Sequence, residues 1–149
     1  MRVKKFRGKR IDTGEWVFGD LLTDVLYGKD KQSGVAIKDT TYHINDGYFN
    51  LIPEVVHPET VGQYTGLKDK NGVEIYEGDV VAVTYDTSYV PCGEVRQWTA
   101  IVERDTVNPT FCLHRTQERY DGDYEYDFVK GGMMELKVIS NIHDNPTSA

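Results

Sequence analysis

The densest group of side chains that could bind a metal ion is the acidic run Asp121-Gly122-Asp123-Tyr124-Glu125-Tyr126-Asp127. Its first, third and fifth residues have the spacing of the first ligands in an EF-hand calcium loop. That loop also needs a glycine at its sixth position and a glutamate at its twelfth, where this sequence has Tyr126 and Gly132. As a strand, the run would instead place its carboxylates on one solvated face and its aromatic rings on the other. We therefore expect no calcium-binding loop, and the sequence leaves open whether the run Asp121 to Asp127 holds a cation in another way.

The remaining metal ligands and nucleophiles are scattered along the chain. The histidines match neither H-E-x-x-H nor H-x-H, and the two cysteines have neither metal-binding nor redox spacing. A nucleophile elbow, a phosphate-binding loop and a dinucleotide fingerprint are also absent from the sequence. We therefore expect no catalytic residues, no metal and no cofactor, and interpret the protein as a non-enzyme. The scattered histidines are His43, His57, His114 and His143, and the two cysteines are Cys92 and Cys112.

The first ten residues are strongly basic, with six Lys or Arg and no acid, whereas the rest of the chain has 11 basic and 24 acidic residues. Aromatic residues follow closely, and cations beside aromatic rings are how small barrels bind single-stranded nucleic acid. The alternative is an edge strand whose cations prevent aggregation and whose neighbouring aromatics, Phe6, Trp16 and Phe18, point into the core. Because the acidic remainder repels phosphate, nucleic-acid binding is possible but not favoured. The candidate nucleic-acid contacts are Lys4, Lys5, Arg7, Lys9 and Arg10.

Length and composition indicate a single globular domain. The chain has 149 residues, 39% hydrophobic and 28% charged, with a formal net charge of -7. A mean hydropathy of -0.52 and short apolar runs exclude a membrane-spanning helix, so we expect no membrane partner. The few cysteines and the lack of a secretory signal predict a cytoplasmic protein.

Turn residues and β-branched or aromatic residues alternate along the chain, which predicts an all-β protein. Hairpin turns are expected at 12–14, 28–34, 45–47 and 70–72, and Pro53 and Pro58 predict an edge strand at Val55-Val56. Later strands are expected at 80–85, 94–104, 110–115 and 135–142, with one weak helical segment within 117–130. Many short strands favour a barrel or sandwich, as one domain over residues 1–143 with a polar tail at 144–149.

One segment of the sequence resembles a known protein family. Residues 60–81, TVGQYTGLKDKNGVEIYEGDVV, resemble the signature block of the YopX family, small proteins encoded mainly by phages and prophages of Gram-positive bacteria. The opening Lys5-Phe6-Arg7 and the residues 18–22, FGDLL, are similar to the opening hairpin of that family. The closing residues 138–146, VISNIHDNP, are similar to its final motif, with Ser140 where a glycine is usual.

The resemblance implies a mainly β, partly open pseudo-barrel of short antiparallel strands, capped by a short helix. It implies no established activity and no catalytic residues. Our leading hypothesis is a non-enzymatic phage or prophage accessory protein that binds a macromolecule, an unidentified protein partner, in the bacterial host cytoplasm. A nucleic-acid-binding barrel that uses the basic N-terminal strand is the alternative, and a metal-dependent hydrolase is the third hypothesis. Exposed strand edges would also permit a homo-oligomer.

Overall fold

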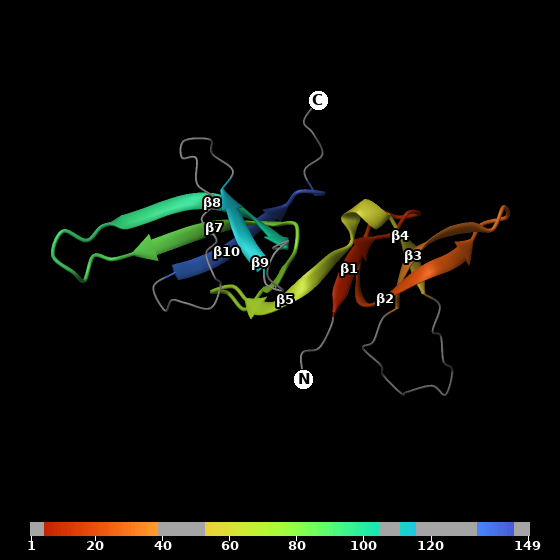
Figure 1. Ribbon diagram of the computed structural model, residues 1–149, viewed down its shortest axis with the longest axis horizontal. Helices are drawn as coiled ribbons and strands as arrows, with labels where there is room; N and C mark the ends of the chain where they lie inside the picture. Colours follow the sequence, from red (N-terminus) through yellow and green to blue (C-terminus); the bar gives the residue numbers. More distant parts are fainter. Residues whose placement is uncertain (1–4, 39–52, 105–110, 116–133, 145–149) are drawn as a thin grey trace, which may run out of the picture. The chain divides into compact units, whose positions relative to one another are not determined.

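The computed structural model of the chain describes residues 5–38, 53–104, 111–115 and 134–144. In this part of the chain the regular elements are strands in two antiparallel sheets, ordered β4-β3-β2-β1-β5-β6 and β10-β7-β8-β9, with one 3₁₀ turn (Figure 1). The predicted all-β class is therefore confirmed. The chain divides into two compact units, Met1–Tyr64 and Thr65–Ala149, and the boundary falls inside β5 (Gly62–Lys68). The prediction of a single domain over residues 1–143 stays a prediction.

The first unit begins with the hairpin of β1 (Phe6–Lys9) and β2 (Trp16–Tyr27), followed by β3 (Gln32–Lys38) and β4 (Glu54–Val56). The turn between β1 and β2 uses Gly14 at φ 72°, as its sequence predicts. The next turn is shorter than predicted, because pairing continues through polar residues as far as Tyr27 and Gln32. The sequence predicted a longer turn because the residues at the start of β3 are polar. Strand pairing extends through them because backbone hydrogen bonds do not depend on side-chain polarity.

The sheet of the first unit curls so that β4 returns to the end of β1. Strand β4 pairs with β3 on one side, and on the other side Arg10 and Val56 form an isolated antiparallel bridge. The His57 N–H donates to the Lys9 carbonyl at 2.8 Å. The 3₁₀ turn η1 (Pro58–Thr60) follows, and the Lys9 N–H donates to the Thr60 hydroxyl at 2.9 Å. This partial closure agrees with the predicted partly open pseudo-barrel.

The curl brings β1 and β4 so close that only a glycine fits at position 8. A Cβ added to Gly8 would lie 2.9 Å from Cγ2 of Val56, which is closer than carbon atoms pack. Val56 itself is 1% exposed, as is Ile37 of β3. The packing of Val56 in the core of this unit therefore requires that residue 8 has no side chain.

The second unit contains the rest of β5, then β6 (Glu74–Tyr76), β7 (Asp79–Asp86), β8 (Val95–Arg104), β9 (Phe111–Arg115) and β10 (Met134–Asn141). Gly72 has φ 81°, which confirms the tight turn predicted at 70–72. The predicted strands at 80–85, 94–104, 110–115 and 135–142 are all found within one or two residues of their expected ends. The sheet places β10 beside β7, although about fifty residues separate these strands in sequence.

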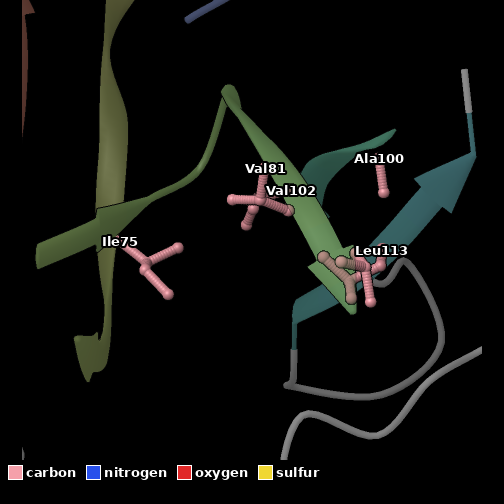
Figure 2. Close-up of a cluster of buried hydrophobic side chains, with 6 residues drawn as sticks. Ile75, Val81, Ala100, Val102 and Leu113 are labelled. Atoms are coloured by element: carbon pink, nitrogen blue, oxygen red, sulfur yellow. The ribbon is translucent and has the colours of Figure 1, made fainter. Parts of the chain in front are cut away.

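The hydrophobic core of the second unit lies on one face of its sheet. Strand register places Val81 between Ala100 and Val138, and Val83 between Trp98 and Leu136. Figure 2 shows five labelled members of the buried cluster, which come from β6, β7, β8 and β9. Because side chains alternate along a strand, the residues between these valines face the opposite side of the sheet. The buried cluster consists of Ile75, Val81, Val83, Ala100, Val102 and Leu113.

Three predicted features lie outside the residues that the structure describes: the hairpin around 45–47, the helical segment within 117–130 and the acidic run at 121–127. The family resemblance implied a short helical cap, and the helical element found in the described ranges is the turn Pro58–Thr60. In those ranges no helix is both long enough and apolar enough to span a bilayer.

We expect Gly8→Ala to lower the free energy of unfolding by about 1–3 kcal/mol, because the new methyl group overlaps Val56. Val56→Ala vacates that space, so the double variant should lose less stability than the sum of the two single losses. Urea unfolding followed by circular dichroism measures all three variants. Strictly additive losses would show that residue 8 does not meet Val56.

Candidate functional site

The predicted basic contacts of β1 lie on one face of the first hairpin with two aromatic rings. Register pairs Arg7 with Phe18 and Lys9 with Trp16, and directly paired residues share a face. Cζ of Arg7 lies 4.6 Å, and Nζ of Lys9 5.3 Å, from the centre of the Trp16 ring. Nζ of Lys5 lies 5.9 Å from the centre of the Phe18 ring. We call these five residues the cation–aromatic strip.

The rings of the strip already bind its own cations. Cation–π contacts of this kind contribute about 0.5–2 kcal/mol, more when the cation is desolvated. Arg7 is 8% exposed, so it has little surface left for a phosphate group. Lys5 and Lys9 are half-buried. The cations and aromatic rings that alternate in the sequence are thus neighbours in the structure, where they contact one another.

Arg10 points away from the strip and is held by two acids. Its guanidinium donates to both carboxylate oxygens of Asp12, at 2.9 and 2.7 Å, and lies 3.1 Å from Glu54. The hydrogen bonds from Arg10 lower the pKa of Asp12, and the hydrogen bond to Asp12 raises that of Arg10. Lys4 lies outside the described residues. Among the predicted nucleic-acid contacts that the structure describes, Arg10 therefore lies apart from the other three. The role of all five residues in binding stays a prediction.

Strand β1 pairs with β2 and with β5, so the predicted edge strand is wrong, and the neighbouring aromatic residues divide between the two faces of the hairpin. Phe18 is 41% exposed and Trp16 is half-buried, both on the cation-bearing face. Phe6 belongs to the opposite face of β1 and is half-buried. Phe18 is therefore not a core residue.

Within the family-like block, Asp69 organises the turn that follows β5. Its Oδ1 accepts hydrogen bonds from the N–H groups of Asn71 at 2.8 Å and Val73 at 2.9 Å. Its Oδ2 accepts a third, from the N–H of Val138 in β10, at 2.9 Å. One carboxylate thus closes a local turn and also fastens a strand that is 69 residues away in sequence.

The charge of Asp69 is maintained against its burial. Burial is the largest single influence and by itself would raise the pKa of this carboxyl group, which is 7% exposed. The three backbone N–H donors, together with the nearby positive charge of Lys137, outweigh burial, so the pKa of Asp69 lies below its ordinary value. Asp69 is therefore an ionised structural group at neutral pH.

Asp79 has a similar role at the start of β7. It is 1% exposed and accepts hydrogen bonds from the Tyr76 N–H at 2.8 Å and from Nδ2 of Asn141 at 3.3 Å. The preceding Gly78 has φ 90°, and its N–H donates to the Val102 carbonyl at 2.8 Å. Asp79 thus joins the loop before β7 to the end of β10. Both buried acids of the block thus stabilise the fold.

Metal-binding groups do not gather in the described part of the chain, where no three His, Cys, Asp or Glu side chains are placed to hold an ion. Cys92 is exposed and Cys112 is half-buried, and neither forms a disulfide. Nδ1 of His57 lies 3.7 Å from the Glu59 carboxylate, on the surface. His43 and the acidic run at 121–127 are not described. The expected absence of metal and cofactor stays a prediction.

The segment at 88–92 between β7 and β8, which we call the hairpin tip, presents exposed apolar side chains that the sequence-based predictions did not include. Tyr89 is 62% exposed and Val90 43% exposed, and Val95 at the start of β8 is 52% exposed. Large apolar side chains at the end of a hairpin are available to a partner. The signal in the sequence was the uncharged stretch 87–93, with adjacent Tyr89 and Val90, inside a loop that must face solvent.

The hairpin tip is held by its own hydrogen bonds. The N–H of Thr87 donates to the Glu94 carbonyl at 3.1 Å, and the N–H of Glu94 donates to the Thr87 hydroxyl at 3.1 Å. Inside this closure, the Val90 N–H donates to the Thr87 carbonyl and the Gly93 N–H to the Val90 carbonyl. A Cβ on Gly93 would overlap the Thr87 carbonyl oxygen, at 1.6 Å. The exposed side chains are thus presented on an ordered backbone.

Comparison with known proteins shows the family. The pattern of the family described as YopX protein matches residues 5–148, and the chain belongs to the YopX family. Among solved structures, the chain is similar to protein EF1440 from Enterococcus faecalis, seen in a crystal structure, with 23% sequence identity and a TM-score of 0.44. That similarity covers 97% of this chain and 96% of the other. Curated proteins gave no match.

We expect Asp69→Asn to be less stable than the wild type at pH 7 by about 1–3 kcal/mol, because it loses the charge that its backbone donors favour. A lowered folded-state pKa stabilises the fold above the unfolded pKa of about 3.9, and this stabilisation is lost as the pH falls through the folded value. The wild type should therefore lose more stability than the variant between neutral pH and about pH 2. Urea unfolding across this range measures both, and equal acid dependence would contradict the structural role.

We expect only weak binding of DNA or RNA, no tighter than about tens of micromolar at physiological salt, because few cations of β1 are accessible. Lys5→Glu combined with Lys9→Glu should leave this weak binding nearly unchanged. Fluorescence anisotropy with labelled single- and double-stranded oligonucleotides measures it. A sub-micromolar complex would contradict this expectation if it lost about 0.9 log units of affinity per log unit of salt for each duplex phosphate contacted, and if the folded double variant abolished it.

Proposed function

We propose that this YopX-family chain is a non-enzymatic phage or prophage accessory protein that binds a protein partner in the host cytoplasm through its hairpin tip. The observation that carries the proposal is the exposure of Tyr89 and Val90 on a loop ordered by its own backbone hydrogen bonds. Burial of such groups stabilises a complex by about 25 cal/mol per Å² of apolar surface. Tyrosine is also enriched among the residues that dominate binding energies at interfaces.

The ordered backbone favours recognition because less conformational entropy is lost on binding. Immobilising a side chain or loop at an interface costs about 0.5–1.5 kcal/mol for each flexible side chain. The hydrogen bonds between Thr87 and Glu94 already fix the loop before a partner arrives. The tip therefore resembles the preorganised anchors that insert into a pocket on a partner protein.

Charge favours a protein over a nucleic acid as the partner of the tip. Between Asp86 and Glu94 the chain carries no cation, and the nearest, Arg96, forms an ion pair with Glu94. Hydrogen bonds from the hydroxyl and the N–H of Ser88 lower the pKa of Asp86, which stays ionised and repels phosphate. The fitting partner has an apolar pocket with Lys or Arg at its rim.

The other two hypotheses have less support. For nucleic-acid binding, Arg7 is buried against Trp16 and Arg10 is paired with acids, which leaves Lys5 and Lys9 half-buried. For a metal-dependent hydrolase, the described part of the chain contributes no observation in favour. A protein partner is accordingly the proposal that we retain.

The test compares the double variant Tyr89→Ser/Val90→Ser with the control Leu26→Ser, which alters a side chain of β2 that is 63% exposed. A partner is first isolated from host lysate with the wild type and then titrated by calorimetry against each purified protein. We expect the tip variant to bind at least about 30-fold more weakly, a loss typical of an interface anchor, and the control to bind as the wild type does.

Thermal melting confirms that both variants are folded. A partner that binds the tip variant and the wild type equally well would overturn the assignment of the tip. Isolation of nucleic acid alone, released by salt and by Lys5→Glu/Lys9→Glu, would favour the alternative function instead.

A further inference from the structure

The sheet of the second unit has a hollow of about 400 Å³ on the face opposite its hydrophobic core. Its floor contains the half-buried residues Ala82, Thr84 and Thr99. We call it the sheet hollow. The exposed side chains that line it are Lys70, Gln97, Glu135 and Lys137.

Strand register explains why the sheet is hollow here. Ala82 of β7 lies between Lys137 of β10 and Thr99 of β8, so the smallest side chain occupies the centre of its row. In the next row Thr84 lies between Glu135 and Gln97. The longer side chains of Glu135 and Lys137 on β10 and of Gln97 on β8 thus form walls around a floor of small residues.

The wall formed by β10 and the turn after β5 is firmly positioned. The Lys70 N–H donates to the Leu136 carbonyl at 3.0 Å, one residue from Lys137. Asp69, next to Lys70, accepts the Val138 N–H on the other side of Lys137. The backbone thus holds Lys70 and Lys137 on the same wall.

The chemistry of the lining divides the hollow into two ends. Lys70 and Lys137 bring two positive charges, and neither forms an ion pair with another residue in the described ranges. The second row brings the carboxylate of Glu135 and hydrogen-bonding groups on Thr84 and Gln97, whose Oγ1 and Nε2 lie 3.4 Å apart. A matching ligand carries an anionic group at one end and hydrogen-bond donors at the other.

We propose that the sheet hollow binds a small hydroxylated organic anion, a phosphate monoester or a carboxylate, with its charge against Lys70 and Lys137. Its hydroxyl groups donate to Glu135 and exchange hydrogen bonds with Thr84. The volume lies within the range of about 300–1,000 Å³ that is usual for small-ligand sites. Charge-assisted hydrogen bonds to lysine supply most of the affinity. This site is separate from the hairpin tip and does not depend on the proposed function.

The experiment titrates the ¹⁵N-labelled full chain with four probes and follows its amide resonances. Glycerol 3-phosphate and glycerate carry the two anionic groups on similar three-carbon skeletons, glycerol carries no charge, and inorganic phosphate carries no hydroxylated skeleton. We expect at least one of the two organic anions to bind with a dissociation constant of about 1 mM or tighter, with shifts centred on Ala82, Thr84 and Thr99. Glycerol should produce no saturable shift. Comparing the phosphate with the carboxylate identifies the anionic group.

Matched lysine variants separate a built site from general attraction to positive charge. Lys70→Gln/Lys137→Gln should weaken binding at least about tenfold, whereas Lys5→Gln/Lys9→Gln in the first unit should leave it unchanged. Glu135→Gln should strengthen the binding of inorganic phosphate and reduce the advantage of glycerol 3-phosphate over it. This last result would assign the hydroxyl-binding end.

Two outcomes would overturn the proposal. One is the absence of saturable shifts at the three floor residues with about 20 mM of either organic anion, far above the expected dissociation constant. The other is an equal loss of binding in the two lysine pairs, which would indicate non-specific charge attraction. Partner binding is tested separately, with the variant Tyr89→Ser/Val90→Ser. Failure of this proposal and failure of the proposed function are therefore distinguishable.

Discussion

The carboxylate of Asp69 is the interaction on which most of the second unit depends. Its three backbone hydrogen bonds join the turn after β5 to β10, and the ionised form is retained despite burial. Strand β10 then contributes Leu136 and Val138 to the hydrophobic core, and Glu135 and Lys137 to the sheet hollow. Loss of this one anchor would therefore alter the core and the hollow together.

Strand register divides the same sheet into two chemically different faces. Val81 and Val83 point into the core, and Ala82 and Thr84 form the floor of the sheet hollow, so a shift of one residue would exchange the two sets. At the far end, the buried Asp79 accepts a hydrogen bond from Asn141 and holds β10 in place. The register shift between Val138 and Ser140 lies just before this contact.

The first unit uses its charges differently. Lys5, Arg7 and Lys9 lie against Trp16 or Phe18, and Arg10 pairs with acids. The cations and rings whose pattern favours nucleic-acid recognition in sequence therefore largely contact one another within the hairpin. By contrast, the hairpin tip between β7 and β8 has few charges but places Tyr89 and Val90 in solvent. Exposed apolar surface on an ordered loop is better evidence of a partner than charge that is already paired.

The sequence by itself determined the local features of the protein: its all-β class, the glycine turns at Gly14 and Gly72, the edge strand at Val55-Val56 and the family block. These follow from the backbone preferences of a few adjacent residues, which short segments carry within themselves. Only the tertiary structure decided that Asp69 reaches Val138, that Gly8 must leave room for Val56, and that Arg7 is buried against Trp16. Such contacts depend on which strands pair and in which register, and residues far apart in sequence do not encode this by their spacing.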